Sequence, residues 1–138
     1  MTPVLLDTGV LVALIDQRER RHSECLTVVE ELRRPLVTCE AVVAESCYLL
    51  RRFRVGVEAI LDNVVRGIFY LSPVLENSAA SVQGIMHKYR DQSIDLADAC
   101  LIHLADELDT GEILTLDRDF LFYRWRKTRS FKLLVDLD

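Results

Sequence analysis

The chain has 138 residues, of which 50% are hydrophobic and 28% are charged, with only 5 Gly and 3 Pro. This balance excludes disordered, collagen-like and low-complexity chains, and the length predicts a single domain over residues 1–138. The net charge of −5 argues, taken alone, against a nucleic-acid partner.

Membrane and secretion signals are missing from the sequence. No apolar stretch approaches the roughly 18 residues of a membrane span, and the N-terminus lacks a signal-peptide pattern. We therefore expect a cytoplasmic protein without membrane contact. The four cysteines form no CxxC pair and are interpreted as small buried hydrophobes: Cys25, Cys39, Cys47 and Cys100.

Short apolar segments alternate with longer amphipathic segments along the chain. The predicted strands are 4–6, 36–38, 68–71, 113–116 and 131–135. The predicted helices are 9–15, 23–32, 38 or 39 to 53, 57–66, 77–89, 94–108 and 119–125, with Gly56 as a break. Short, wholly apolar strands are typical of a parallel sheet that is covered on both faces. We therefore predict an α/β fold, a three-layer α/β/α sandwich with a short-stranded, mostly parallel central sheet.

Two aspartates stand where such a fold places its ligand site. Asp7 directly follows the first predicted strand, and Asp117 directly follows the strand at 113–116. Ligands of open α/β sheets bind beyond the carboxyl ends of the strands. A simple turn or helix-capping role stays open for both residues.

Two further acids border helix faces that are otherwise apolar. They are Asp98, in the predicted helix 94–108, and Glu45, in the helix that ends at 53. An ionised carboxylate is costly to bury unless it is paired or bound to a metal. The alternatives are a salt bridge from Glu45 to Arg52 and a capping role for Asp98.

The nearby acids Asp95 and Asp119 are less clear from the pattern. Asp95 is interpreted as a helix cap. Asp119 is either an acid in the first turn of a helix, which the helix dipole favours, or a further member of the group of acids formed by Asp7, Glu45, Asp98 and Asp117. Five carboxylates in one cleft, including Asp119, would require a divalent cation. All-oxygen ligation suits Mg²⁺ or Mn²⁺, which serve phosphoryl chemistry. Setting those five acids aside leaves 17 acidic and 17 basic residues, so the remaining surface can carry basic patches.

One basic patch is visible near the C-terminus. The segment 118–132 holds six basic residues against one acid, together with five of the ten aromatic residues. Basic side chains follow a phosphate backbone, and aromatic rings stack on unpaired bases. The candidate nucleic-acid contacts are Arg118, Arg124, Arg126 and Lys127. The alternative is that the aromatic residues belong to the core and the bases to a solvated face.

These residues resemble a PIN domain, and more narrowly a VapC-type toxin ribonuclease of a prokaryotic toxin–antitoxin pair. The resemblance covers almost the whole chain in order and spacing. The matching elements are Val4-Leu5-Leu6 with Asp7-Thr8, His22, Glu45, Asp98-Ala99, and Thr115-Leu116-Asp117-Arg118-Asp119-Phe120.

The resemblance implies a metal-dependent hydrolase of single-stranded RNA that forms a homodimer and is inhibited by a small antitoxin protein. It implies that Asp7, Glu45, Asp98 and Asp117 are catalytic, and that His22 is structural. The implied ligands of Mg²⁺ or Mn²⁺ are Asp7, Asp98, Asp117 and Asp119. Thr8 and Thr115 are the implied supporting residues.

Three other interpretations use the same residues. Asp7-Thr8-Gly9 resembles the motif of aspartic proteases, but that fold is almost entirely β. A phosphatase of the haloacid dehalogenase type also places an Asp after its first strand, but its motif requires a second Asp where this chain has Gly9. The third is a PIN-like module that binds nucleic acid or protein without catalysis, for which a missing acid would be the sign.

Overall fold

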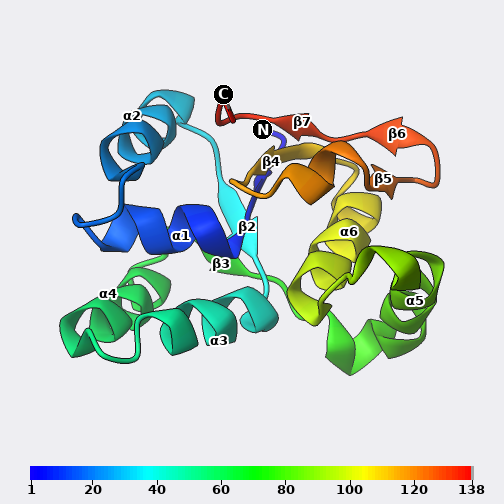
Figure 1. Cartoon of the computed structure of the whole chain (residues 1–138), viewed down its shortest axis with the longest axis horizontal. Helices are drawn as coiled ribbons and strands as arrows, with labels where there is room; N and C mark the ends of the chain where they lie inside the picture. Colours follow the sequence, from blue (N-terminus) through cyan, green and yellow to red (C-terminus); the bar gives the residue numbers. More distant parts are fainter. Residues whose placement is uncertain (138) are drawn as a thin grey trace.

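A five-stranded sheet between helices forms the centre of the computed structural model, which describes residues 1–137 (Figure 1). Its strands are β1 (Val4–Leu6), β2 (Leu36–Thr38), β3 (Tyr70–Leu71), β4 (Glu112–Leu114) and β7 (Lys132–Leu133). They lie in the order β3-β2-β1-β4-β7, and every pairing between them is parallel. The predicted α/β fold with a short-stranded parallel sheet is therefore confirmed.

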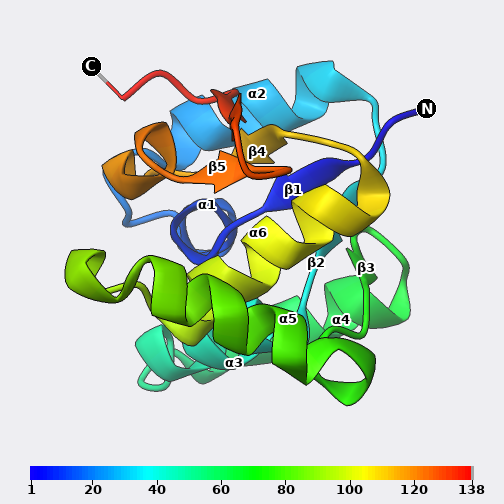
Figure 2. The same cartoon turned by 90° about the vertical axis from the view of Figure 1, so that its right-hand side faces the viewer.

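Helices cover both faces of the sheet. The α-helices are α1 (Thr8–Ile15), α2 (His22–Leu32), α3 (Glu40–Leu49), α4 (Arg54–Val65), α5 (Leu75–Lys88) and α6 (Leu96–Leu108). Two short 3-10 helices follow α5 and β4, namely η1 (Arg90–Gln92) and η2 (Arg118–Leu121). Figures 1 and 2 show α5 and α6 on one side of the sheet and α1 and α2 on the other, which is the predicted three-layer arrangement. No helix within residues 1–137 combines the length and apolar character that a membrane span requires.

The core explains why the strands are apolar throughout. All three residues of β1 are fully buried, because the central strand has helices on both faces. Helix α6 packs between the sheet and α5, so most of its side chains are buried as well. A polar side chain on the inner face of α6 is therefore withdrawn from water.

The predicted break at Gly56 is wrong. Helix α3 ends at Leu49, α4 already begins at Arg54, and Gly56 lies inside α4. A Cβ atom at Gly56 would stand 2.6 Å from the ring of Phe53. This glycine is therefore needed for close packing against Phe53, and the actual break is the turn at 50–53.

The predicted helix 119–125 is also wrong beyond η2. Its last residues form β5 (Arg124–Trp125), which pairs antiparallel with β6 (Arg129–Ser130). The Trp125 indole N–H donates to the Ser130 carbonyl at 3.1 Å, and the same ring covers Gly111 so closely that a Cβ there would lie 2.0 Å away. Tertiary packing of this tryptophan thus overrides the local helical pattern.

Candidate active site

The carboxyl ends of β1 and β4 meet at one point of the sheet edge. Leu6 pairs with Leu114, and the Asp7 N–H donates to the Leu114 carbonyl at 3.0 Å. After β1, the strands β2 and β3 are added on one side of it, whereas the later strands β4 and β7 lie on its other side. The ends of β1 and β4 are therefore the topological switch point, where open α/β sheets bind ligands.

An acidic pocket of about 270 Å³ opens at this switch point. Five of its lining residues are carboxylates: Asp7, Glu45, Asp95, Asp98 and Asp117. The other lining residues are Thr8, Gly9, Leu49 and Leu116, so no basic side chain lines the pocket. The structure thus brings together the four acids that the sequence singled out, from β1, α3, α6 and the turn after β4.

Asp7 is held in a fixed orientation at the base of the pocket. Its side chain is only 5% exposed. One carboxylate oxygen accepts the Thr8 backbone N–H at 2.7 Å, and the other accepts the Thr115 hydroxyl at 2.6 Å. Burial raises the pKa of Asp7 to about 6, although the hydrogen bond from Thr115 opposes this shift.

Asp98 is buried on the inner face of α6, and the Tyr123 hydroxyl donates to its Oδ2 at 3.1 Å. Burial, followed by the charges of Asp95, Asp7 and Asp117, raises the pKa of Asp98 to about 8. Burial and this carboxylate also raise the pKa of Tyr123, so the phenol remains a donor. The surroundings of Asp98 therefore favour its protonated form when no cation is present.

Glu45 and Asp117 complete the group. The Thr8 hydroxyl donates to Glu45 Oε1 at 2.7 Å, and the ion pairs within residues 1–137 include none between Glu45 and Arg52. Asp117 caps η2 by accepting the Asp119 backbone N–H at 2.8 Å. Burial raises the pKa of Asp117 too. Its predicted capping role and its place in the pocket therefore coexist.

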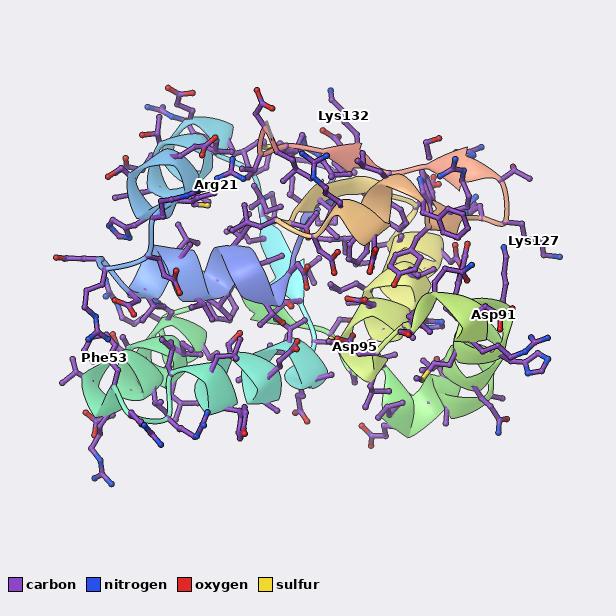
Figure 3. The ribbon with its side chains drawn as sticks, viewed as in Figure 1. Arg21, Phe53, Asp91, Asp95, Lys127 and Lys132 are labelled. Carbon is purple, nitrogen blue, oxygen red and sulfur yellow. The ribbon has the colours of Figure 1, made fainter. Side chains whose placement is uncertain are left out.

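Two acids differ from the sequence-based interpretation. Asp119 is exposed and is not among the residues that line the pocket, although its charge contributes to the raised pKa of Asp117. Asp95 is the N-cap of α6, as expected, since it accepts the Asp98 N–H at 2.8 Å. It also lines the pocket, which the sequence analysis missed (Figure 3). The signal that could have found it is its spacing of three residues before Asp98 on one helix.

His22 ties two helices together rather than entering the pocket. Its Nδ1 lies 2.7 Å from the Ala13 carbonyl oxygen at the end of α1. The cysteine prediction holds for the buried Cys25, Cys39 and Cys100, whereas Cys47 is half-buried; all four thiols are free.

The donor set of the acidic pocket fits a hard divalent cation. Every polar side-chain atom that lines it is an oxygen, and burial without a counter-charge raises the pKa of three of its acids. Within residues 1–137, no three His, Cys, Asp or Glu side chains are already arranged to hold one ion. The fit to a hard cation therefore rests on the all-oxygen lining of the pocket.

Thr115 supports two of the acids at once. Its fully buried hydroxyl donates to Asp7 and accepts the Asp117 N–H at 3.0 Å. We expect Thr115→Val to lower RNA cleavage by about 10- to 100-fold, because residues that orient a metal ligand have effects of that size. We expect a loss of about 1–2 kcal/mol in the free energy of unfolding. Thr115→Ser keeps the hydroxyl, so equal activity of the two variants, measured by initial rates, would contradict this role.

The four predicted RNA-binding residues lie outside the acidic pocket. Arg118 donates to a main-chain carbonyl near the C-terminus, and Arg126 Nη1 stands 3.5 Å from Asp109 Oδ1. Arg124 and Lys127 line a different pocket. Figure 3 shows Lys127 beside the β5–β6 hairpin, far along the molecule from Asp95.

Most aromatic residues of the same segment belong to the core. The buried ones are Phe120, Tyr123, Trp125 and Phe131. Phe122, in contrast, is 54% exposed. Among the aromatic residues of this segment, only Phe122 therefore has a largely exposed ring on which a base could stack.

Comparisons with known proteins agree with this fold. The PIN domain family model matches residues 4–126. The chain is 36% identical over 118 residues to ribonuclease VapC26 of Mycobacterium tuberculosis, covering 83% of this chain and 87% of that protein. The crystal structure of M. tuberculosis VapC20, a toxin that cleaves the sarcin–ricin loop, matches this chain with a TM-score of 0.81 at 16% sequence identity. The match covers 91% of this chain and 98% of that chain, and it shows that the two proteins share a fold. The chain therefore belongs to the PIN-domain family, and within it to the VapC-type ribonucleases.

Proposed function

We propose that this protein is an endoribonuclease that hydrolyses phosphodiester bonds of single-stranded RNA and depends on Mg²⁺ or Mn²⁺. The observation that carries the proposal is the acidic pocket, in which carboxylates from separate segments converge without a basic partner. The VapC26 relative supports the ribonuclease activity. Because none of the four family acids is missing, no observation favours a non-catalytic module.

Asp7, Asp98 and Asp117 would hold the cation, and Glu45 and Asp95 line the same pocket. When bound, the cation would polarise the scissile phosphate and offset the negative charge of the site. Thr8 and Thr115 keep the Asp7 carboxylate in one orientation, so little reorganisation is needed when RNA enters. The Tyr123 hydroxyl fixes Asp98 in the same way.

We also propose a biological setting. VapC20 is described as a toxin, and by analogy this chain would be the toxin of a type II pair, inhibited by a small protein antitoxin. We propose in addition, from the resemblance to this family, that the protein forms a homodimer in the cytoplasm. The four free thiols suit such a reducing compartment.

Cleavage of RNA with and without divalent cation tests the proposed activity. Purified protein is incubated with an unstructured and a structured RNA, with Mg²⁺ or Mn²⁺ and then with excess EDTA. We expect internal cuts in the unstructured RNA that EDTA abolishes and added Mn²⁺ restores. Cleavage that persists in EDTA would exclude a metal-dependent site, and release of terminal phosphate alone would indicate a phosphatase.

A further inference from the structure

A second pocket, of about 220 Å³, lies between the end of α5, the middle of α6 and the β5–β6 hairpin. Its polar lining residues are Ser81, Lys88, Tyr89, Asp106, Arg124 and Lys127. The acidic pocket shares none of these residues. We call this second cavity the basic pocket, because of the balance of its charges.

Three cations face one acid in the basic pocket. The single acid, Asp106, already accepts the Arg126 backbone N–H at 2.5 Å. Within residues 1–137, neither Lys88 nor Lys127 takes part in an ion pair; Lys88 Nζ only stands 5.1 Å from the centroid of the Tyr89 ring. The pocket therefore has an uncompensated positive charge, which favours an anionic ligand.

Arg124 is held rigidly at the wall of this pocket. Its Nη1 donates to the carbonyls of Leu121, Phe122 and Tyr123 at 2.9–3.0 Å, and its backbone N–H donates to the Tyr89 hydroxyl at 3.0 Å. These bonds fix the guanidinium before any ligand binds and do not use its Nη2. A fixed guanidinium loses little conformational entropy when it binds a phosphate.

The hairpin turn keeps a cation where glycine would be less strained. Arg126 and Lys127 have φ angles of 45° and 69°, in the left-handed region. The loop between the paired residues Trp125 and Arg129 has three residues, 126–128. Side chains other than those of Gly, Asn and Asp are strained at such φ angles. Because strain at a conformation of this kind often accompanies function, the lysine side chain itself is the feature to be explained.

An exposed aromatic ring adjoins the basic pocket. Phe122 packs edge-on against Tyr89, with ring centroids 6.1 Å apart, and exposes more than half of its surface. It lies on the chain between Asp117, in the acidic pocket, and Arg124. Arg124 stands seven positions after Asp117, so their Cα atoms are at most about 25 Å apart, a distance that a few nucleotides of extended RNA can span.

We propose that the basic pocket binds a backbone phosphate of the RNA strand at a fixed distance from the cleavage position, with Phe122 stacking on an intervening base. This inference rests on the proposed ribonuclease function. Lys88 and Lys127 supply the two mobile charges, and Arg124 supplies the fixed one. RNA is then cleaved at the acidic pocket while the basic pocket holds another phosphate of the same strand.

The test uses Lys88→Gln with Lys127→Gln in the whole chain, with Lys132→Gln on β7 as the charge-matched control. Binding of a labelled 12-nucleotide unstructured RNA is measured by fluorescence anisotropy in EDTA, from 50 to 200 mM NaCl. Each phosphate contact contributes about 0.7 to the slope of log affinity against log salt. We expect the double variant to lower that slope by about 1.4 and the affinity by about tenfold, and Lys132→Gln to leave both unchanged.

Two further arms separate this proposal from neighbouring ones. A dinucleotide can occupy only one pocket, and in EDTA the basic pocket is the one whose charge attracts its phosphate. The double variant should therefore weaken dinucleotide binding as well, and a dinucleotide affinity that the lysine changes leave unchanged would overturn the phosphate site. Lys127→Gly should keep or raise the melting temperature while it weakens RNA binding. An unchanged salt slope in the double variant would also overturn the proposal, because Lys88 and Lys127 would then make no phosphate contact. Failure of wild-type protein to cleave RNA would count against the proposed function, whereas binding in EDTA judges the basic pocket separately.

Discussion

Replacing Asp7 with Asn is expected to lower the rate of RNA cleavage by about 10²- to 10³-fold while the fold stays intact. Asp7 is the most buried acid of the pocket, and both of its oxygens accept hydrogen bonds that fix their direction. Asn preserves the size of the side chain but removes the charge that attracts a divalent cation. Losses of about 2.7–4 kcal/mol in transition-state stabilisation are typical when one preorganised electrostatic group is removed. Initial rates with a labelled RNA measure the effect.

Asp91→Asn is the matched control, since it makes the same chemical change at an exposed position on η1 (Figure 3). This variant should cleave RNA like the wild type. Circular dichroism and melting curves show whether Asp7→Asn is folded. A folded Asp7→Asn protein with wild-type cleavage would remove Asp7 from the catalytic group.

Asp98→Asn is expected to raise the stability of the metal-free protein at pH 8. The folded-state pKa of Asp98, about 8, lies above the ordinary value of 3.8. The folded state therefore binds this proton more tightly than the unfolded state, and the free energy of unfolding falls as the pH rises from about 4 to about 8. Asn has no proton to lose, so the variant avoids this fall. We expect a gain on the order of 2 kcal/mol at pH 8, or roughly 5–10 °C in melting temperature, and almost none at pH 4.

The same substitution should abolish cleavage, because it removes one of the carboxylates proposed to hold the cation. Asp98 would then lower the stability of the metal-free protein while it serves the activity, as is common for residues of functional sites. Thermal melts in EDTA at pH 4, 6 and 8 measure the first effect. Asp119→Asn, on the exposed neighbour of the pocket, provides the comparison and should show no such dependence on pH. If Asp98→Asn and the wild type had the same melting temperature at pH 8, the surroundings of Asp98 would not raise its pKa, and this prediction would be wrong.

Much of the fold follows from local patterns in the sequence. The apolar strands at 4–6 and 36–38 are where the pattern predicts them, because burial on both faces of the sheet leaves no room for polar residues. The N-cap at Asp95 is also where the sequence predicts it. The β5–β6 hairpin could not be predicted in the same way. It depends on Trp125 packing over Gly111, a contact between residues that are distant in sequence.

The candidate site shows the same division. Asp7 and Asp117 could be found from the ends of predicted strands, and Asp98 from an acid on an apolar helix face. The exposure of Asp119 depends on how η2 folds after Asp117, which the alternation of residues does not encode. The basic pocket was equally hidden, because Lys88 and Lys127 belong to elements that meet only in the folded chain.

Calorimetric titration of Mn²⁺ into the metal-free protein tests the cation site most directly. It is carried out at pH 7 in two buffers with different enthalpies of ionisation, for the wild type and for Asp7→Asn. Because burial and repulsion leave Asp98 protonated at this pH, we predict saturable binding with release of protons from the wild type, and loss of that binding in the variant. Titrations of the two proteins that coincide, or that show no saturable binding, would contradict the account.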